Sequence, residues 1–475
     1  MIEQIRNVPI TPDSYPLTRA SENCNFAYRG YCEEEYFMYG VSNVYAGRHG
    51  KIEALYSGAP YVNRFLVRRP KDIAAASGRV AIEILNATSG FDVDRTWVLC
   101  KEQMMREGDV YIGITSKPSS LRPLHKFDPQ RYAELFWSNP NPAPLARDII
   151  ERSKFGGAYE QASEMGLFWD MLTDLASAVR SGAEFMGKIQ PKKIYLVGWS
   201  QSCGYMIRYA NCFGETGTAS VFDGYFSAAG VRMMTPPLNQ YESSIVPGET
   251  GNVFGPGKTP CILVQTESEN AGMGNLETKL PDSDGPQRWI RTYEIPGATH
   301  DSEYTMLGYY GDKKDEFKTG LLLDYPGEEP WPNNYPYELA FCAAYAHLCD
   351  WVEKDVKPPH MQPIELDFAG RNVRDSLGNA VGGWRLPPID YPVCTYFPYC
   401  TPIVPSPFLK KPLFGCRFPF STAQLHTMYG SLAQYQKLVE QSADECIAAG
   451  RLLEADRGRC INYCLKEAQM FGLTE

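Results

Sequence analysis

The fold is indicated most clearly by the stretch Lys193-Ile194-Tyr195-Leu196-Val197-Gly198-Trp199-Ser200-Gln201-Ser202-Cys203-Gly204-Tyr205. Its first part is a run of β-branched, aromatic and aliphatic residues, which predicts a buried strand over 194–197. A helical pattern follows at once, with Tyr205, Met206, Tyr209 and Ala210 on one face. Strand, tight turn and helix in this order would lift the hydroxyl of Ser200 clear of the sheet. Ser200 is therefore the candidate nucleophile, and the alternative is an ordinary serine in a strand–helix turn.

Small residues are needed where a strand and the following helix nearly touch, and Gly198 and Ser202 stand at those places. Ser202 occupies a position where glycine is common in this pattern. The five-residue pattern is weak by itself, and the strand and helix on either side strengthen it.

The composition is that of an ordinary globular protein. The chain has 475 residues, of which 44% are hydrophobic and 21% charged. Its net charge of −10, from 46 basic and 56 acidic residues, argues against a nucleic-acid partner. No apolar run approaches about 18 residues, so we expect no membrane span. The first residues lack the basic start and apolar core of a signal peptide, which leads us to expect a cytoplasmic protein.

The cysteines are interpreted as free thiols. Fourteen are scattered along the chain, and no C-x-x-C pair occurs among them. A zinc site is therefore not expected. Neither a His-x-x-x-His spacing nor a phosphate-binding loop is present, so we expect no metal and no cofactor.

Strands alternate with helices along most of the chain. Strands are predicted over 61–68, 80–85, 110–115, 194–197, 222–229, 261–266 and 289–295, and helices over 96–107, 159–185, 337–352 and within 421–471. This alternation predicts an α/β fold whose central sheet is mostly parallel, with helices on both faces.

Three regions are predicted on this basis. Residues 1–60 would form an N-terminal extension packed on the core, and residues 61–357 the core itself. Proline-rich excursions at 116–160 and 231–259 would help to cover a binding pocket. Residues 358–475, rich in proline and aromatics and then helical, would form a C-terminal cap packed on the core.

A serine hydroxyl needs a histidine base and a group that orients this base. The six histidines are His49, His125, His300, His347, His360 and His426. His300 follows the predicted strand 291–295 through Pro296-Gly297-Ala298-Thr299, where the base belongs if the order is nucleophile, acid, histidine. His347 lies mid-helix and His360 follows two prolines, so both are interpreted as structural.

The orienting acid should come just after the strand 261–265, where Glu267 and Glu269 compete. The usual strand-to-acid spacing favours Glu269. An earlier glutamate could also reach the imidazole, and we slightly prefer Glu267 at the strand exit. The alternative is that one of them only caps a loop or pairs with Arg291.

The tetrahedral intermediate needs preorganised N–H donors. One should be the backbone N–H of Gln201, which follows the nucleophile at a helix N-terminus. The other should come from the small polar loop Asn86–Gly90 after the strand 80–85. Either the Ala87 N–H or the Asn86 side chain could supply it.

At this point the sequence resembles a family of alpha/beta hydrolase domain-containing proteins, most of them predicted serine hydrolases. The resemblance lies in the Gly-Trp-Ser-Gln-Ser turn, Glu33–Phe37, Val67–Pro70, Asn86–Gly90, Gln265–Glu267, Gly297–His300, Gly378–Ala380, Gly382–Pro387 and Pro419–Ser421. It implies the α/β-hydrolase fold and a triad of Ser200, His300 and either Glu267 or Glu269. Cys203 departs from the pattern, because glycine is expected there.

The resulting hypothesis is a serine hydrolase that cleaves a small-molecule carboxylic ester or lactone. An acyltransferase with the same triad and a catalytically silent small-molecule binder are the alternatives. We expect neither nucleic acid nor membrane as a partner, and the sequence is compatible with a homo-oligomer.

Overall fold

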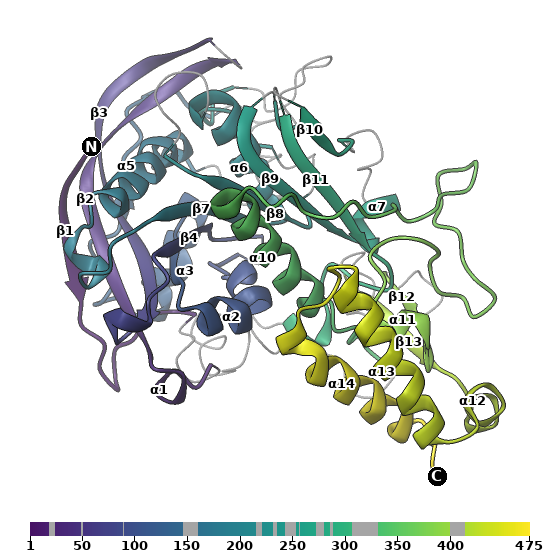
Figure 1. Cartoon of the computed structure of the whole chain (residues 1–475). Coiled ribbons are helices and arrows are strands. Elements are labelled where there is room, and N and C mark those ends of the chain that lie inside the picture. Colours follow the sequence, from purple (N-terminus) through teal and green to yellow (C-terminus); the bar gives the residue numbers. More distant parts are fainter. Residues whose placement is uncertain are drawn as a thin grey trace. The chain divides into compact units, whose positions relative to one another are not determined.

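A computed structural model describes residues 1–18, 24–48, 51–88, 90–145, 160–214, 221–230, 235–242, 253–255, 257–271, 280–285, 288–305, 331–399 and 414–475. These residues form two compact units, each of which is described by itself (Figure 1). The first unit contains Met1–Cys261 and Asp284–Trp289, and the second contains the described residues of Ile262–Ser283, Ile290–Gly308 and Asp324–Glu475.

The first unit is built on a mixed sheet whose strands run in the order β1-β2-β3-β5-β4-β7-β8. Its strands are β1 (Ile2–Val8), β2 (Tyr31–Arg48), β3 (Lys51–Pro70), β4 (Arg79–Ile84), β5 (Val110–Ile114), β7 (Lys193–Trp199) and β8 (Gly224–Ala228), and the short β6 (Phe136–Trp137) pairs with β3. Strands β5, β4, β7 and β8 are parallel, whereas β1, β2 and β3 are antiparallel to their neighbours. The parallel strands are almost wholly buried, as expected where helices cover both faces.

The register of β4 and β7 shows that helices lie on both faces of this sheet. Glu83 is paired with Val197 and Ile84 with Gly198, so the members of each pair point to the same face. The Glu83 carboxylate accepts the first N–H groups of α2 (Arg95–Glu107), which places α2 on that face. Gly198 faces α6 (Gln201–Tyr209) on the other. The other helices of this unit are α1 (Phe26–Arg29), α3 (Leu121–Phe127) and α5 (Phe168–Arg180).

The second unit continues from β9 (Gly257–Thr266), the strand in which the chain leaves the first unit. Strands β9, β11 (Arg288–Ile295) and β10 (Ser283–Gly285) are neighbours in that order, and β12 (Cys394–Phe397) pairs with β13 (Cys416–Pro419). The helices are α7 (Glu267–Ala271), α10 (Glu338–Lys354), α11 (Pro387–Asp390), α12 (Thr422–Tyr429), α13 (Leu432–Ala448) and α14 (Arg457–Met470). Helices α13 and α14 lie side by side (Figure 1). Among the described residues, no helix combines the length and apolar character needed to cross a bilayer.

The predicted α/β class is confirmed, and two elements differ from their prediction. The region 1–60 contains β1, β2 and half of β3, so it belongs to the sheet of the first unit rather than lying on it. The helix predicted over 159–185 is shorter in the structure, where α5 spans the 13 residues Phe168–Arg180. Gly182 follows two residues after its end, and its φ of 73° favours glycine. Parts of the excursions 116–160 and 231–259, together with His49 and Ser89, lie outside the described residues.

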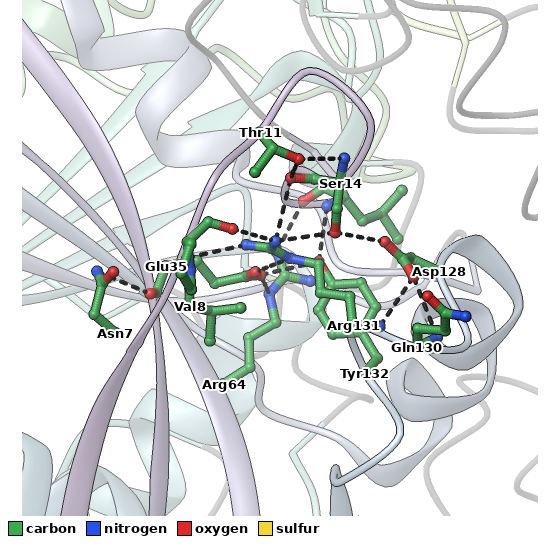
Figure 2. Close-up of polar contacts among 12 residues, drawn as sticks. Asn7, Val8, Thr11, Ser14, Glu35, Arg64, Asp128, Gln130, Arg131 and Tyr132 are labelled. Atoms are coloured by element: carbon green, nitrogen blue, oxygen red, sulfur yellow. Dashed lines mark hydrogen bonds and ion pairs between the residues drawn. The ribbon is translucent and has the colours of Figure 1, made fainter.

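A buried ion-pair network ties the N-terminal segment to the sheet (Figure 2). The Glu35 carboxylate on β2 meets Arg64 Nε at 2.8 Å and Arg131 Nε at 2.6 Å, and it accepts the Tyr132 hydroxyl at 2.9 Å. Arg64 also donates to the carbonyl of Leu17 at 2.8 Å. The two guanidinium groups thus neutralise one carboxylate and hold the chain that follows β1.

Replacing Glu35 by alanine should destabilise the protein severely, since the buried guanidinium groups of Arg64 and Arg131 would both lose this ion-pair partner and the Asp92 carboxylate lies farther from Arg64, at 3.7 Å. We expect a loss of about 3–5 kcal/mol in the free energy of unfolding, measured by urea denaturation. Arg122→Ala is the matched control, because Arg122 is 80% exposed and pairs with Glu160 at the surface. That change should cost less than about 1 kcal/mol. Equal losses for the two variants would contradict the assignment of the Glu35 network as structural.

Candidate active site

Ser200 lies on a one-residue turn between β7 and α6, with φ 55° and ψ −115°. A non-glycine residue with this backbone is strained, by about 1–3 kcal/mol. The strand and the helix approach each other so closely that a Cβ on Gly198 would lie 3.2 Å from the Cβ of Ser202. A side chain at 198 would therefore be crowded by α6, while position 202 accommodates a serine.

Three hydrogen bonds hold this turn. The Ser200 N–H donates to the carbonyl of Ala228 at the end of β8 (2.9 Å), and the Cys203 N–H donates to the Ser200 carbonyl (3.0 Å). The Asn86 side-chain amide donates to the carbonyl of Trp199 (3.0 Å). The loop after β4 and the end of β8 are thereby both fastened to the peptide group between Trp199 and Ser200.

Cys203, which stands where glycine is expected, lies beneath the turn. Its thiol is fully buried and hydrogen-bonds the carbonyls of Gly198 (3.1 Å) and Ala228 (3.2 Å). A Cβ on Gly230 would lie only 2.9 Å from the Cβ of Cys203. The extra side chain at 203 is thus accommodated by a glycine in the loop after β8.

The loop after β4 is closed by reciprocal backbone hydrogen bonds between Asn86 and Val93, at 3.0 and 2.8 Å. Ala87 is buried inside this closure. The Asn86 side chain is occupied on both sides, since its amide donates to Trp199 and its oxygen accepts the Thr88 N–H at 2.8 Å. An amide nitrogen carries two N–H groups and Trp199 uses one of them, so the Asn86 side chain and the Ala87 N–H both stay candidates for the donor from this loop.

Lys117 is hydrogen-bonded to Leu85, the residue that precedes this loop. It follows β5, is fully buried, and donates through Nζ to the carbonyl of Leu85 (3.1 Å) and to Ser116 Oγ (2.7 Å). The Nζ also lies 4.5 Å from the ring centroid of Tyr205 on α6. Burial lowers the pKa of Lys117 to about 7, against the opposing effect of Asp92.

In the second unit, His300 and Glu269 form a buried pair. His300 Nδ1 lies 2.6 Å from Glu269 Oε1. The other carboxylate oxygen accepts the backbone N–H (2.7 Å) and the hydroxyl (2.8 Å) of Thr266. With the Nδ1 proton donated to this carboxylate, Nε2 carries the lone pair and can act as a base.

Glu267 faces another partner. Its buried carboxylate accepts the Gly297 N–H at 2.7 Å and the Asn372 side-chain amide at 3.2 Å, and it forms an ion pair with Arg374. Burial raises the pKa of Glu267, while Arg374 acts to lower it. These contacts give no support to the slight preference for Glu267 as the orienting acid, because the carboxylate that meets His300 belongs to Glu269.

Arg291, His347 and His360 were the other residues considered for this site, and each has contacts of its own. Arg291 Nε donates to the carbonyl of Pro358 (3.0 Å) and lies 4.0 Å from an oxygen of Asp282. His347 Nε2 contacts the Gly450 carbonyl (2.7 Å), and His360 pairs with Asp282 at the surface (2.8 Å). Both histidines therefore have structural contacts of their own.

The sequence matches the family model described as "Alpha/beta hydrolase domain" over residues 5–462. The chain belongs to this family. No curated protein sequence matches it.

Several solved structures resemble this alpha/beta hydrolase chain at low identity. A fungal esterase from Rhizomucor miehei is 11% identical over 73% of this chain and 94% of its own, with a TM-score of 0.29. A cold-adapted esterase from an Arctic intertidal metagenomic library is 11% identical over 61% and 95%, with a TM-score of 0.29. A serine hydrolase homologue from Coxiella burnetii is 9% identical over 55% and 93%, with a TM-score of 0.28. With TM-scores this low, the family assignment rests on the sequence match.

Among the described residues of this alpha/beta hydrolase chain, no group of three or more His, Cys, Asp or Glu could hold a metal ion.

Sequence reasoning missed Lys117 and Arg374, which contact the loops that carry the candidate site residues. The only signal for Lys117 was its place directly after a buried strand, and Arg374 had none.

Lys117 should give the protein a measurable pH dependence of stability. A lysine in an unfolded chain titrates at about 10.4, so above about pH 7 the unfolded state binds more protons at this site than the folded state. Stability from this site therefore increases as the pH rises from about 7 to about 10. Relative to Lys117→Met, the wild-type free energy of unfolding should rise by roughly 1 kcal/mol per pH unit, measured by urea denaturation. A difference that stays constant with pH would show that Lys117 titrates normally.

Proposed function

We propose that this chain is a serine hydrolase that cleaves a carboxylic ester or lactone through an acyl-serine intermediate. Ser200 is the nucleophile, His300 the general base and acid, and Glu269 the residue that orients the imidazole. The observation that carries the proposal is the buried contact of His300 Nδ1 with Glu269 at 2.6 Å, because it fixes the tautomer that a base requires. The strained backbone of Ser200 and the membership of the chain in the alpha/beta hydrolase family add support.

The reaction would proceed in two balanced steps. Ser200 Oγ attacks the ester carbonyl carbon while His300 Nε2 accepts its proton, and the tetrahedral intermediate collapses by breaking the bond to the alcohol, which leaves with that proton. Water then attacks the carbonyl carbon of the acyl-serine while His300 Nε2 accepts a proton from it, and the intermediate collapses by breaking the bond to Ser200 Oγ, which takes that proton back as the carboxylic acid leaves. The backbone N–H of Gln201, together with either the Ala87 N–H or the Asn86 side chain, is proposed to stabilise the oxyanion in both steps.

Removing the nucleophile or the base should abolish turnover. We expect Ser200→Ala and His300→Ala each to lower kcat on a p-nitrophenyl ester by roughly 10³-fold or more. Labelling by a fluorophosphonate probe should be lost in Ser200→Ala. It should be retained in Ser177→Ala, which removes an exposed hydroxyl on α5. Full activity or full labelling of Ser200→Ala would reject the proposed nucleophile.

The two glutamates should differ in their effect on the rate. Glu269→Gln keeps the shape of the side chain but loses the charge that orients His300, so kcat should fall by about 10²–10⁴-fold. Glu267→Gln keeps an oxygen for the Gly297 N–H and should cost less than about tenfold. Steady-state kinetics of the two variants distinguish them, and a larger loss for Glu267→Gln would reverse the assignment.

Acyl transfer to an alcohol remains the second use of the same groups, and a non-catalytic binder is the third. Product analysis with an added alcohol separates the first two, since a transferase forms the new ester in preference to the acid. A binder would show neither labelling nor turnover.

A further inference from the structure

We propose that Glu267 and Arg374 form a positioning pair, through which the C-terminal segment holds the loops that carry Glu269 and His300. The inference rests on the proposed function and extends it to residues outside the triad. Arg374 belongs to a compact double hairpin of residues 363–383, closed by backbone bridges of Ile364 with Gly382 and of Leu366 with Asn372.

Glu267 connects the acid loop to the histidine loop. Its backbone N–H donates to the Ala298 carbonyl (3.1 Å), and its side chain accepts the Gly297 N–H (2.7 Å). Both partners lie within three residues of His300 in the sequence. A shift of the Glu267 carboxylate would therefore move the backbone that leads into the base.

Arg374 is itself fixed in place. Its Nη1 donates to the carbonyls of Gly378 (3.2 Å) and Tyr396 (3.4 Å), and its guanidinium lies 5.3 Å from the ring centroid of Phe397. The other nitrogen, Nη2, makes the ion pair with Glu267. The guanidinium thus links the acid loop to the double hairpin and to β12 at once.

Two further side chains, those of Asn372 and Ser268, join the same segments. Asn372 donates to Glu267 (3.2 Å) and accepts the side-chain amide of Asn270 (3.1 Å). Ser268 Oγ accepts the His300 N–H (3.0 Å) and donates to the Pro398 carbonyl (2.6 Å). Residues 372–398 therefore contact the acid loop on both sides of Glu269, and none of these contacts involves the Glu269 carboxylate itself.

The ion pair is also the element that keeps Glu267 charged. A buried carboxylate is costly unless it is paired, and the backbone and amide donors supply only part of the compensation. Loss of Arg374 would leave a buried charge, which the loop could relieve only by moving or by taking up a proton. Removing the charge as well should therefore restore the loop.

The test uses the full chain and a p-nitrophenyl butyrate assay, with kcat normalised to the fraction of protein labelled at the end point by a fluorophosphonate. Arg374→Met should lower kcat by about tenfold or more and change KM by less than about twofold, because the acid–base pair is displaced while ester binding is not. The double variant Arg374→Met/Glu267→Gln should recover to within about threefold of Glu267→Gln alone. Arg371→Met is the matched control, since Arg371 lies on the same double hairpin, is 75% exposed and pairs only with Asp367 within it. Its kcat should stay within about twofold of wild type.

The proposal is overturned if Arg374→Met keeps wild-type kcat, if KM alone rises, or if Glu267→Gln fails to rescue the Arg374 variant. Arg374→Gln, which also removes the positive charge, replaces Arg374→Met if circular dichroism shows that the latter is unfolded, and the same outcomes decide. Failure of the serine-hydrolase proposal would give a different result, namely a Ser200→Ala variant that keeps its activity. An inactive Ser200→Ala with an unaffected Arg374→Met would reject only the positioning role.

Discussion

The close approach of β7 and α6 at Gly198 constrains the rest of the site. Because strand and helix are separated by a single residue, Ser200 must adopt a positive φ that a serine disfavours. Such a conformation persists only where its surroundings determine it. Here the surroundings are the Ala228 carbonyl, which accepts the Ser200 N–H, and the Asn86 amide, which holds the carbonyl just before the serine. The loop after β4 and the end of β8 therefore help to hold Ser200 in this backbone conformation.

The two glutamates after β9 show how environment separates the roles of identical side chains. Glu269 is bound by Thr266 and meets an imidazole, whereas Glu267 is bound by a backbone N–H and meets a guanidinium. An imidazole that gains and loses a proton needs a fixed carboxylate beside it. A guanidinium never loses its proton, so its partner can only hold a position. The chemistry of the partner is the reason for proposing Glu269 in the reaction and Glu267 in the framework.

The parts that sequence could predict are those governed by local pattern. Strands such as β4 and β7 are buried on both faces and read as continuous apolar runs, so they were found. Strand β2 was missed because it buries Glu35, whose partner Arg64 is supplied by another strand and cannot be seen locally. The sequence also left the choice between the two glutamates open, for a related reason. Both glutamates lie in the first turn of α7, where successive residues are rotated by roughly 100° about the helix axis. Two residues apart, their side chains point to nearly opposite sides of the helix. The distance from the end of the strand therefore does not decide which one meets His300.

Buried ion pairs add little net stability, since desolvation offsets most of the attraction, and their use is better sought in the segments that they fix. In the first unit, the Glu35 pair also binds the carbonyl of Leu17, so it fixes the course of the chain after β1. In the second unit, the pair of Glu267 and Arg374 binds the Gly297 N–H, the Gly378 carbonyl within the double hairpin and the Tyr396 carbonyl on β12. An apolar pair of equal volume could fill the same space, but it could not donate to or accept from those backbone groups. The loops that carry His300 and Glu269 are therefore held by directional contacts, which the proposed role of His300 as a base would require.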